Sequence, residues 1–144
     1  MAERLSVLLL SGSFDRAHYA LSIASTAAAL ERPTTLFATL GGTRALLAED
    51  GQGRPGWACL PPSAELAEPG LGDGASLDAR NRARGVAGFE ELLQACVALG
   101  VEFMVCEMGL RALDLPAQAL RDDVPIRTGG LATLLGLGGQ FVVI

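Results

Sequence analysis

The apolar residues of this chain gather in five short segments, some of them continuous apolar runs and others mixed with β-branched residues or proline, separated by longer stretches in which apolar positions recur at helical spacing. A continuous apolar run bounded by turn residues is typical of a strand buried on both faces. The sequence therefore predicts strands at residues 5–10, 34–39, 101–106, 124–127 and 140–144.

The stretches between these runs have a helical repeat. Alanine and leucine recur every three or four positions after Asp15, which predicts a helix that reaches about Glu31, because Pro33 prevents it from continuing. A second amphipathic helix is predicted from Val86 to Gly100, which is suited to a helix end. Shorter helices are predicted at residues 43–50, 113–120 and 130–137. This alternation predicts a single α/β domain over residues 1–144, a three-layer α/β/α sandwich with a five-stranded, mainly parallel sheet.

Residues 51–85 interrupt the alternation. They contain seven glycines and four prolines and show no sustained period. Structureless segments of this length are uncommon in compact domains and are usually functional or disordered. We predict a long Gly/Pro-rich mobile loop at about 50–85, with one helical turn near residues 76–81, and no second domain.

Composition and charge narrow the classes of function. A formal net charge of −5 disfavours nucleic-acid binding, which needs a basic face. The sequence contains no signal-like segment and no apolar stretch long enough for a membrane span. Three cysteines in such a chain favour reduced thiols in the cytoplasm. One histidine and three dispersed cysteines supply no evident metal site, and no cofactor is expected.

The segment Val101–Leu110, VEFMVCEMGL, carries the clearest chemical signal. Its cysteine, Cys106, lies where a predicted strand ends and a polar turn begins. The carboxyl ends of parallel strands form the edge at which open α/β sheets bind their ligands. A thiol at this edge is expected to be accessible, and the start of a following helix favours its ionisation. Sulfur transfer by thiolate attack requires both properties.

Three segments together resemble the DsrE/DsrF-like family of sulfur-relay proteins. SGSFDRAHYALSIASTAAALERPTTLFATLGGTRALL is similar to that family's first strand, alanine-rich helix and second strand with its glycine turn. GFEELLQACVALGVEFMVCEMGL resembles its helix and strand ending in cysteine. VPIRTGGLATLLGLGGQFVVI resembles its closing helix and strand. These segments cover most of the chain outside the loop, and their order carries the likeness more than any single motif.

The resemblance implies a function and an assembly. It implies that Cys106 carries sulfur as a persulfide between donor and acceptor proteins, as a carrier more than as an enzyme with its own turnover. Met108 matches the branch with a methionine shortly after the cysteine, whereas Glu107 is more acidic than the family pattern. The resemblance also implies an oligomer, often a trimer or hexamer. The apolar closing strand, residues 140–144, independently favours association if it lies at a sheet edge.

The other two cysteines have different predicted roles. Cys96 falls on the apolar face of a helix and is predicted to be buried in the core. Cys59 lies in the predicted loop, and we consider two hypotheses for it. It is either an incidental loop residue or a relay or resolving thiol that forms a disulfide with Cys106.

Several residues around the predicted strand ends could support the cysteine. Ser13 and Phe14 belong to the turn after the first strand, where an anion could bind a helix N-terminus. His18 in the next helix could position or deprotonate a thiol, although a surface role is the alternative. Gly41 forms the turn after the second strand. Glu107 opposes ionisation of Cys106 unless it faces away from the thiol, and Arg111 could compensate for it.

Two other functions remain open at this stage. In the first, the domain is a non-catalytic assembly module of the same fold and Cys106 is only buried. In the second, the strand-end crevice binds a small ligand such as a nucleotide or an anion. The glycines do not match a nucleotide-binding motif, and no serine-hydrolase motif is present.

Overall fold

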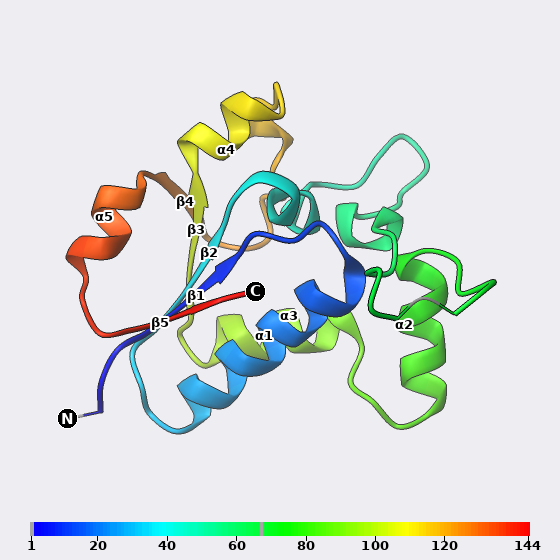
Figure 1. The fold of residues 1–144 in the computed structure, drawn as a ribbon, viewed down its shortest axis with the longest axis horizontal. Helices are drawn as coiled ribbons and strands as arrows, with labels where there is room; N and C mark the ends of the chain where they lie inside the picture. Colours follow the sequence, from blue (N-terminus) through cyan, green and yellow to red (C-terminus); the bar gives the residue numbers. More distant parts are fainter. Residues whose placement is uncertain (1, 67) are drawn as a thin grey trace.

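The computed structural model describes residues 2–66 and 68–144, and these form one five-stranded parallel sheet in the order β4-β3-β2-β1-β5 (Figure 1). All four strand pairings are parallel, and the predicted α/β fold is confirmed. The strands are β1 (Leu5–Leu9), β2 (Thr34–Ala38), β3 (Glu102–Cys106), β4 (Ile126–Gly129) and β5 (Gln140–Val143). The apolar closing strand β5 lies at an edge of the sheet, beside β1.

Helices cover the two faces of this sheet unequally. The α-helices are α1 (Phe14–Ala29), α2 (Gly74–Ala83), α3 (Phe89–Ala98), α4 (Glu107–Ala112) and α5 (Leu131–Gly136). Short 3₁₀ helices are η1 (Leu40–Leu46), η2 (Gly56–Cys59) and η3 (Ala117–Ala119). In Figure 1, α1 and α3 lie together on one side of the sheet, α5 lies on the opposite side, and α4 stands at the end of β3. None of the helices in the described ranges is long and apolar enough to cross a membrane.

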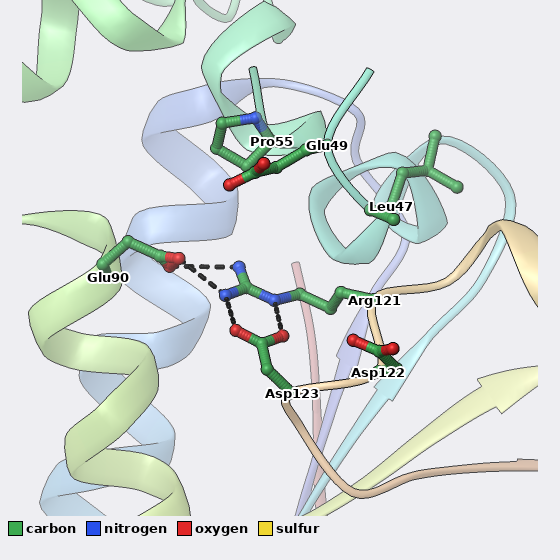
Figure 2. A pocket seen from close by; sticks show the side chains of 8 residues that line it. Leu47, Glu49, Pro55, Glu90, Arg121, Asp122 and Asp123 are labelled. Carbon is green, nitrogen blue, oxygen red and sulfur yellow. Dashed lines mark hydrogen bonds and ion pairs between the residues drawn. The ribbon is translucent and has the colours of Figure 1, made fainter. Parts of the chain in front are cut away.

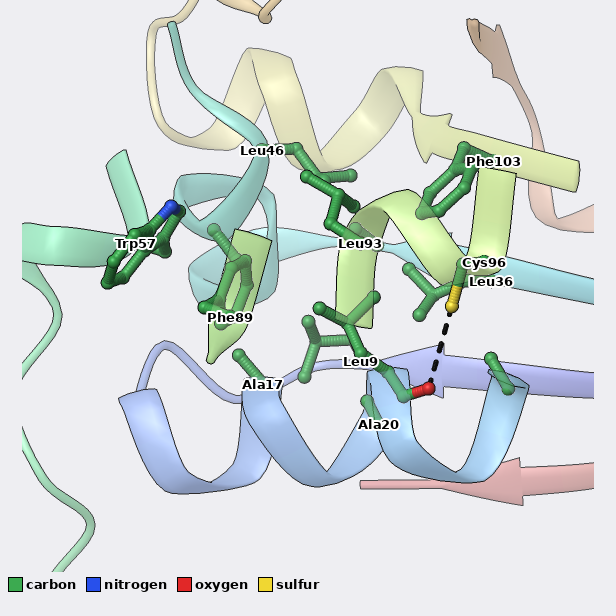
Figure 3. Close-up of a cluster of buried hydrophobic side chains, with 14 of the residues drawn as sticks. Leu9, Ala17, Ala20, Leu36, Leu46, Trp57, Phe89, Leu93, Cys96 and Phe103 are labelled. Atoms are coloured by element: carbon green, nitrogen blue, oxygen red, sulfur yellow. Dashed lines mark hydrogen bonds between the residues drawn. The ribbon is translucent and has the colours of Figure 1, made fainter. Parts of the chain in front are cut away.

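Strand alternation divides the buried side chains into two clusters, because neighbouring residues of a strand point to opposite faces. On the first face, strand residues such as Leu9, Leu36 and Phe103 pack against α1 and α3 (Figure 3). The side of α1 that faces the sheet is lined largely by small alanines, which lets the helix lie close to the sheet. The second face is defined by four fully buried residues, namely Phe37, Met104, Cys106 and Leu134.

The second face is only partly covered. The six-residue α5 is buried there through Leu134. Large apolar side chains on and beside α5 and β5 remain exposed, namely Leu131, Leu135, Leu137, Phe141 and Val143. The third layer of the predicted sandwich therefore exists, but in these residues it amounts to one short helix.

The connection after β3 differs from the prediction. A helix was predicted at residues 113–120, whereas α4 begins directly after Cys106 and ends at Ala112. Asp114 has a φ of 53°, a left-handed conformation that does not continue a helix. Pro116 is extended and precedes the single 3₁₀ turn η3. The observed helix therefore lies earlier in the sequence than predicted, directly after the candidate residue Cys106.

The segment 51–85, of which residue 67 lies outside the described residues, contains more regular secondary structure than predicted. It contains η2 and a ten-residue helix α2, where only one helical turn was predicted. Tertiary contacts hold this helix: Leu77 is buried, and Asp78 accepts a hydrogen bond from the Phe89 backbone N–H at 2.7 Å. Trp57 from η2 is also buried and stacks on Phe89. The predicted mobility of this segment remains a prediction.

Candidate functional site

Cys106 is the last residue of β3 and immediately precedes the first residue of α4. This placement at the carboxyl end of a parallel strand agrees with the sequence analysis. Gly109 brings α4 close to the end of β2, since a Cβ atom there would lie 2.7 Å from the Leu40 backbone nitrogen. A glycine at this position therefore lets α4 pack against the neighbouring strand end.

The accessibility predicted for the Cys106 thiol is wrong for this conformation. Cys106 is 3% exposed and packs with Phe37, Met104 and Leu134. The strand pleat sends Cys106 to the second face, the same face as Met104, where Leu134 of α5 belongs to the same buried cluster. The thiol is therefore enclosed by apolar side chains at the carboxyl end of β3.

The residues after Cys106 point mostly to solvent. Glu107, Met108 and Arg111 are exposed, and Met108 retains 65% of its accessible surface. Within residues 2–66 and 68–144, Glu107 and Arg111 form no ion pair with each other. Because the Glu107 carboxylate is in solvent while the thiol is buried, water and salt screen its charge. The predicted compensation by Arg111 has no contact to support it in the described residues.

Cys96 is a core residue, as predicted. It is fully buried on the first face, and its Sγ atom lies 3.5 Å from the Leu21 backbone oxygen, to which it donates a hydrogen bond (Figure 3). Burial raises the pKa of the Cys96 thiol to about 12. Cys96 is therefore a neutral packing residue at ordinary pH.

Cys59 is the exposed cysteine of this chain. It ends η2, whose Trp57 and Ala58 belong to the core on the first face. The side chain of Cys106 lies on the second face. All three cysteines are free, and the structure does not bring Cys59 and Cys106 together.

His18, Ser13 and Phe14 lie on the first-face side and not beside Cys106. His18 Nε2 is 2.8 Å from the Ala87 backbone oxygen, and its ring is 5.8 Å from that of Phe14. Phe14 is buried in the core, and Ser13 Oγ is 2.8 Å from Ser11 Oγ. These contacts assign all three residues to packing and local hydrogen bonding.

The first turn of α1 is occupied by another part of the chain. The Phe14 backbone N–H donates to the Pro61 oxygen at 2.8 Å. Ser63 donates to the Asp15 carboxylate through its backbone N–H at 2.7 Å and its hydroxyl at 2.5 Å. The Pro61 carbonyl thus occupies one N–H group that an anion would need, and the Asp15 carboxylate adds negative charge in the same turn, so this helix end does not offer the predicted anion site.

Gly41 has a steric role in the turn after β2. A Cβ atom there would lie 2.8 Å from the backbone nitrogen of Gly12, which belongs to the turn after β1. The two turns therefore pack backbone against backbone at the carboxyl edge of the sheet.

A buried arginine cluster was not predicted from the sequence. Arg121 has a side chain only 8% exposed and forms paired hydrogen bonds with Asp123, both at 2.7 Å, and with Glu90, at 2.6 and 3.0 Å (Figure 2). The hydrogen bond to Asp123, followed by that to Glu90, raises the pKa of Arg121 above its ordinary value. The sequence feature that could have indicated this cluster is the Arg-Asp-Asp run at 121–123, just before the buried Val124.

This cluster is better explained as a structural link than as a site. It borders a cavity of about 390 Å³ that Glu49 and Asp122 also line. Its single cation is already saturated by two carboxylates, so it has little capacity left for an anionic ligand. Among the described residues, no group of three or more His, Cys, Asp or Glu side chains is arranged to hold a metal ion. The pairs tie α3 to the segment before β4.

Comparison with known proteins places this geometry in context. No family model matches the chain. The sulfur carrier protein DsrE2 of Allochromatium vinosum is 30% identical to it over an alignment of 152 positions, gaps included, which covers 96% of this chain and 94% of the relative. The structure of MTH1491, a protein of unknown function from Methanobacterium thermoautotrophicum, aligns with 99% of this chain and 100% of its own at 14% identity and a TM-score of 0.60. The ychN protein of E. coli aligns over 100% of both chains at 16% identity and a TM-score of 0.56. These two structures share the fold.

Proposed function

Because the chain belongs to the DsrE-like family, we propose that it is a sulfur carrier that holds sulfane sulfur as a persulfide on Cys106 and passes it between donor and acceptor proteins. The observation that carries this proposal is the near full-length similarity to a protein named as a sulfur carrier. The position of Cys106 at the end of β3 supports the choice of residue.

The proposed transfer needs only a thiol and a persulfide. The Cys106 thiolate attacks the outer sulfur of a donor persulfide, and the donor S–S bond breaks. The electron pair of that bond leaves with the donor thiolate, so no external oxidant or reductant is required. The same reaction with an acceptor thiolate returns the sulfur and regenerates Cys106.

The enclosed position of Cys106 gives the carrier a means of protecting its cargo. Persulfides and thiolates react with solutes, and susceptibility follows exposure. Within the described residues, α5 is the only helix over the second face, and Leu134 is its one buried residue. A helix held by so few buried contacts belongs to the elements that open locally at low cost. We infer that displacement of α5, alone or by a partner protein, gives access to Cys106.

We also infer that the chain forms a homo-oligomer through the second face. The resemblance to the family, whose members often form trimers or hexamers, supports this inference. Contiguous exposed apolar side chains mark protein interaction sites, and the residues of α5 and β5 form such a group. Val143, on the edge strand β5, is 64% exposed. Val143→Glu should dissociate the oligomer without unfolding the protein, as measured by analytical ultracentrifugation and circular dichroism. A wild-type protein that sediments as a monomer would contradict this inference.

The burial of Cys106 favours one alternative, an assembly module of the same fold without sulfur transfer. The three free thiols fit a reducing, cytoplasmic setting under either function.

Sulfur loading distinguishes the carrier from the assembly module. The protein is incubated with a persulfidated sulfurtransferase, and intact mass is measured for wild type, Cys106→Ser and Cys59→Ser. The carrier function predicts one added sulfur on Cys106 in wild type and in Cys59→Ser. A Cys59→Ser protein that never gains sulfur, yet keeps its oligomeric size, supports the assembly module instead.

A further inference from the structure

The exposed Cys59 lines a second cavity, separate from the surroundings of Cys106. The cavity has a volume of about 320 Å³ and lies between the turn after β1, η1 and the segment 54–61. Leu47, Leu60 and Pro61 provide apolar walls, and two arginines, Arg44 and Arg54, line it together with the thiol. A nucleophile, two cations and an apolar wall therefore share one small hollow.

Arg54 is held against the Cys59 segment. Its Nη2 donates to the Ala58 backbone oxygen at 3.0 Å and pairs with the Asp73 carboxylate at 2.5 Å. The hydrogen bond to Asp73 is the main cause that raises the pKa of Arg54. The arginine is thus anchored beside the segment that carries Cys59.

One cation that lines the cavity has no carboxylate partner in the described residues, although Asp50 keeps its negative charge nearby. Asp50 also lines the cavity, but its carboxylate accepts hydrogen bonds from the backbone N–H groups of Gln52, at 2.8 Å, and Arg54, at 3.0 Å. Arg44 is exposed and forms no ion pair within the described part of the chain. Asp73 engages Arg54, so Arg44 is the cation available to an incoming anion.

We propose that this cavity binds a small organic persulfide that carries a carboxylate, and that Cys59 accepts its outer sulfur. The inference rests on the proposed function in treating the chain as a sulfur carrier, and it adds a second entry point and a class of donor. The volume is at the lower end of ligand cavities, which suits a small molecule. The apolar walls would contact the carbon chain, and Arg44 would attract the carboxylate.

The transfer step is balanced without another reactant. The Cys59 thiolate attacks the outer sulfur of R–S–SH, and a new S–S bond forms as the bond within the donor breaks. The electron pair leaves with R–S⁻, and the proton stays on the transferred sulfur. The segment that carries Cys59 packs into the first-face core, whereas Cys106 lies on the second face. The sulfur would therefore leave Cys59 to another molecule and not directly to Cys106 in the same chain.

The test uses two matched donors, the persulfides of 3-mercaptopropionate and of 3-mercaptopropanol, which differ in charge but hardly in size. In Cys106→Ser protein, peptide-resolved mass spectrometry should find one sulfur added to Cys59, and the carboxylate donor should react faster. Arg44→Gln should slow the carboxylate donor about two- to fivefold, the effect of an exposed ion pair, and leave the alcohol donor unchanged. Arg84→Gln, an equal charge change at an exposed residue away from the cavity, should alter neither rate.

Two outcomes would overturn the inference. Absence of sulfur on Cys59 with both donors would exclude the site. Equal rates for both donors, unaffected by Arg44→Gln, would show an unselective surface thiol. Neither outcome bears on Cys106, whose loading is measured separately in Cys59→Ser protein, so the inference and the proposed function fail independently.

Discussion

Access to Cys106 should be controlled by a single leucine of α5. Leu134 is fully buried in the same cluster as Cys106, Phe37 and Met104, while most of its own helix is exposed. Leu134→Ala removes the main buried anchor of α5. Core Leu→Ala changes cost about 2–5 kcal/mol, and the lower part of that range suits a site that can partly collapse.

If α5 opens as a local unit, this loss lowers the free energy of that opening. A loss of about 2–3 kcal/mol corresponds to roughly a 30- to 150-fold increase in the open population, since each 1.4 kcal/mol is about a factor of ten. The alkylation rate of Cys106 by iodoacetamide should rise by a similar factor. The measurement is made in Cys59→Ser protein, so that the exposed thiol does not consume reagent.

Cys96 serves as the internal control for global unfolding. It is fully buried on the other face, and its pKa of about 12 keeps it neutral and unreactive in the native state. Leu135→Ala, at a neighbouring residue that is 54% exposed, should leave both rates unchanged. The reasoning fails if Leu134→Ala does not accelerate Cys106, or if it accelerates Cys96 equally, because the second result would mean that the whole domain opens.

Two further predictions concern stability. Gly41→Ala should lower the free energy of unfolding by about 1–3 kcal/mol in urea denaturation, because the new Cβ would lie 2.8 Å from the Gly12 backbone nitrogen. The control is Gly51→Ala, whose Cβ would meet none of the described atoms within 4 Å. Equal stabilities of the two variants would refute the steric argument. The Arg121 hydrogen bond lowers the pKa of Asp123, so this carboxylate stabilises the fold above its unfolded pKa, near 3.8, and that stability is lost as pH falls through its lower folded pKa. Asp123→Asn should therefore lower Tm at pH 7, and this deficit should shrink as pH falls below 3.8 and through the lower folded pKa, whereas Asp122→Asn should change little across the same range. A deficit that does not shrink in acid would contradict the ion-pair explanation.

The sheet could be predicted from the sequence because each buried strand is a continuous apolar run that ends at turn residues. Residue 106 was correctly placed at a strand end for the same reason. The burial of Cys106 was not predicted, because the cluster that encloses it includes Leu134, twenty-eight positions later, on a helix whose pattern does not show where it packs.

The full length of helix α2 was not predicted, for a different reason. Its sequence, GASLDARNRA, has almost no apolar periodicity, and Leu77 is its one large apolar residue. Long-range contacts such as the Asp78–Phe89 hydrogen bond hold it in place, and no local pattern records them. The Arg121 cluster likewise joins residues 31 positions apart, so a pair of neighbouring charges gave only a weak local signal.

The claim that Cys106 both accepts and returns sulfur is tested most directly by a charge-and-chase experiment. Cys59→Ser protein is loaded from a persulfidated sulfurtransferase, freed of donor and mixed with a reduced cysteine peptide while intact masses are followed. The account predicts that one sulfur appears on Cys106, then leaves it and appears on the peptide in equal amount. Sulfur that never loads on Cys106, or that loads and cannot be transferred to the peptide, would contradict it.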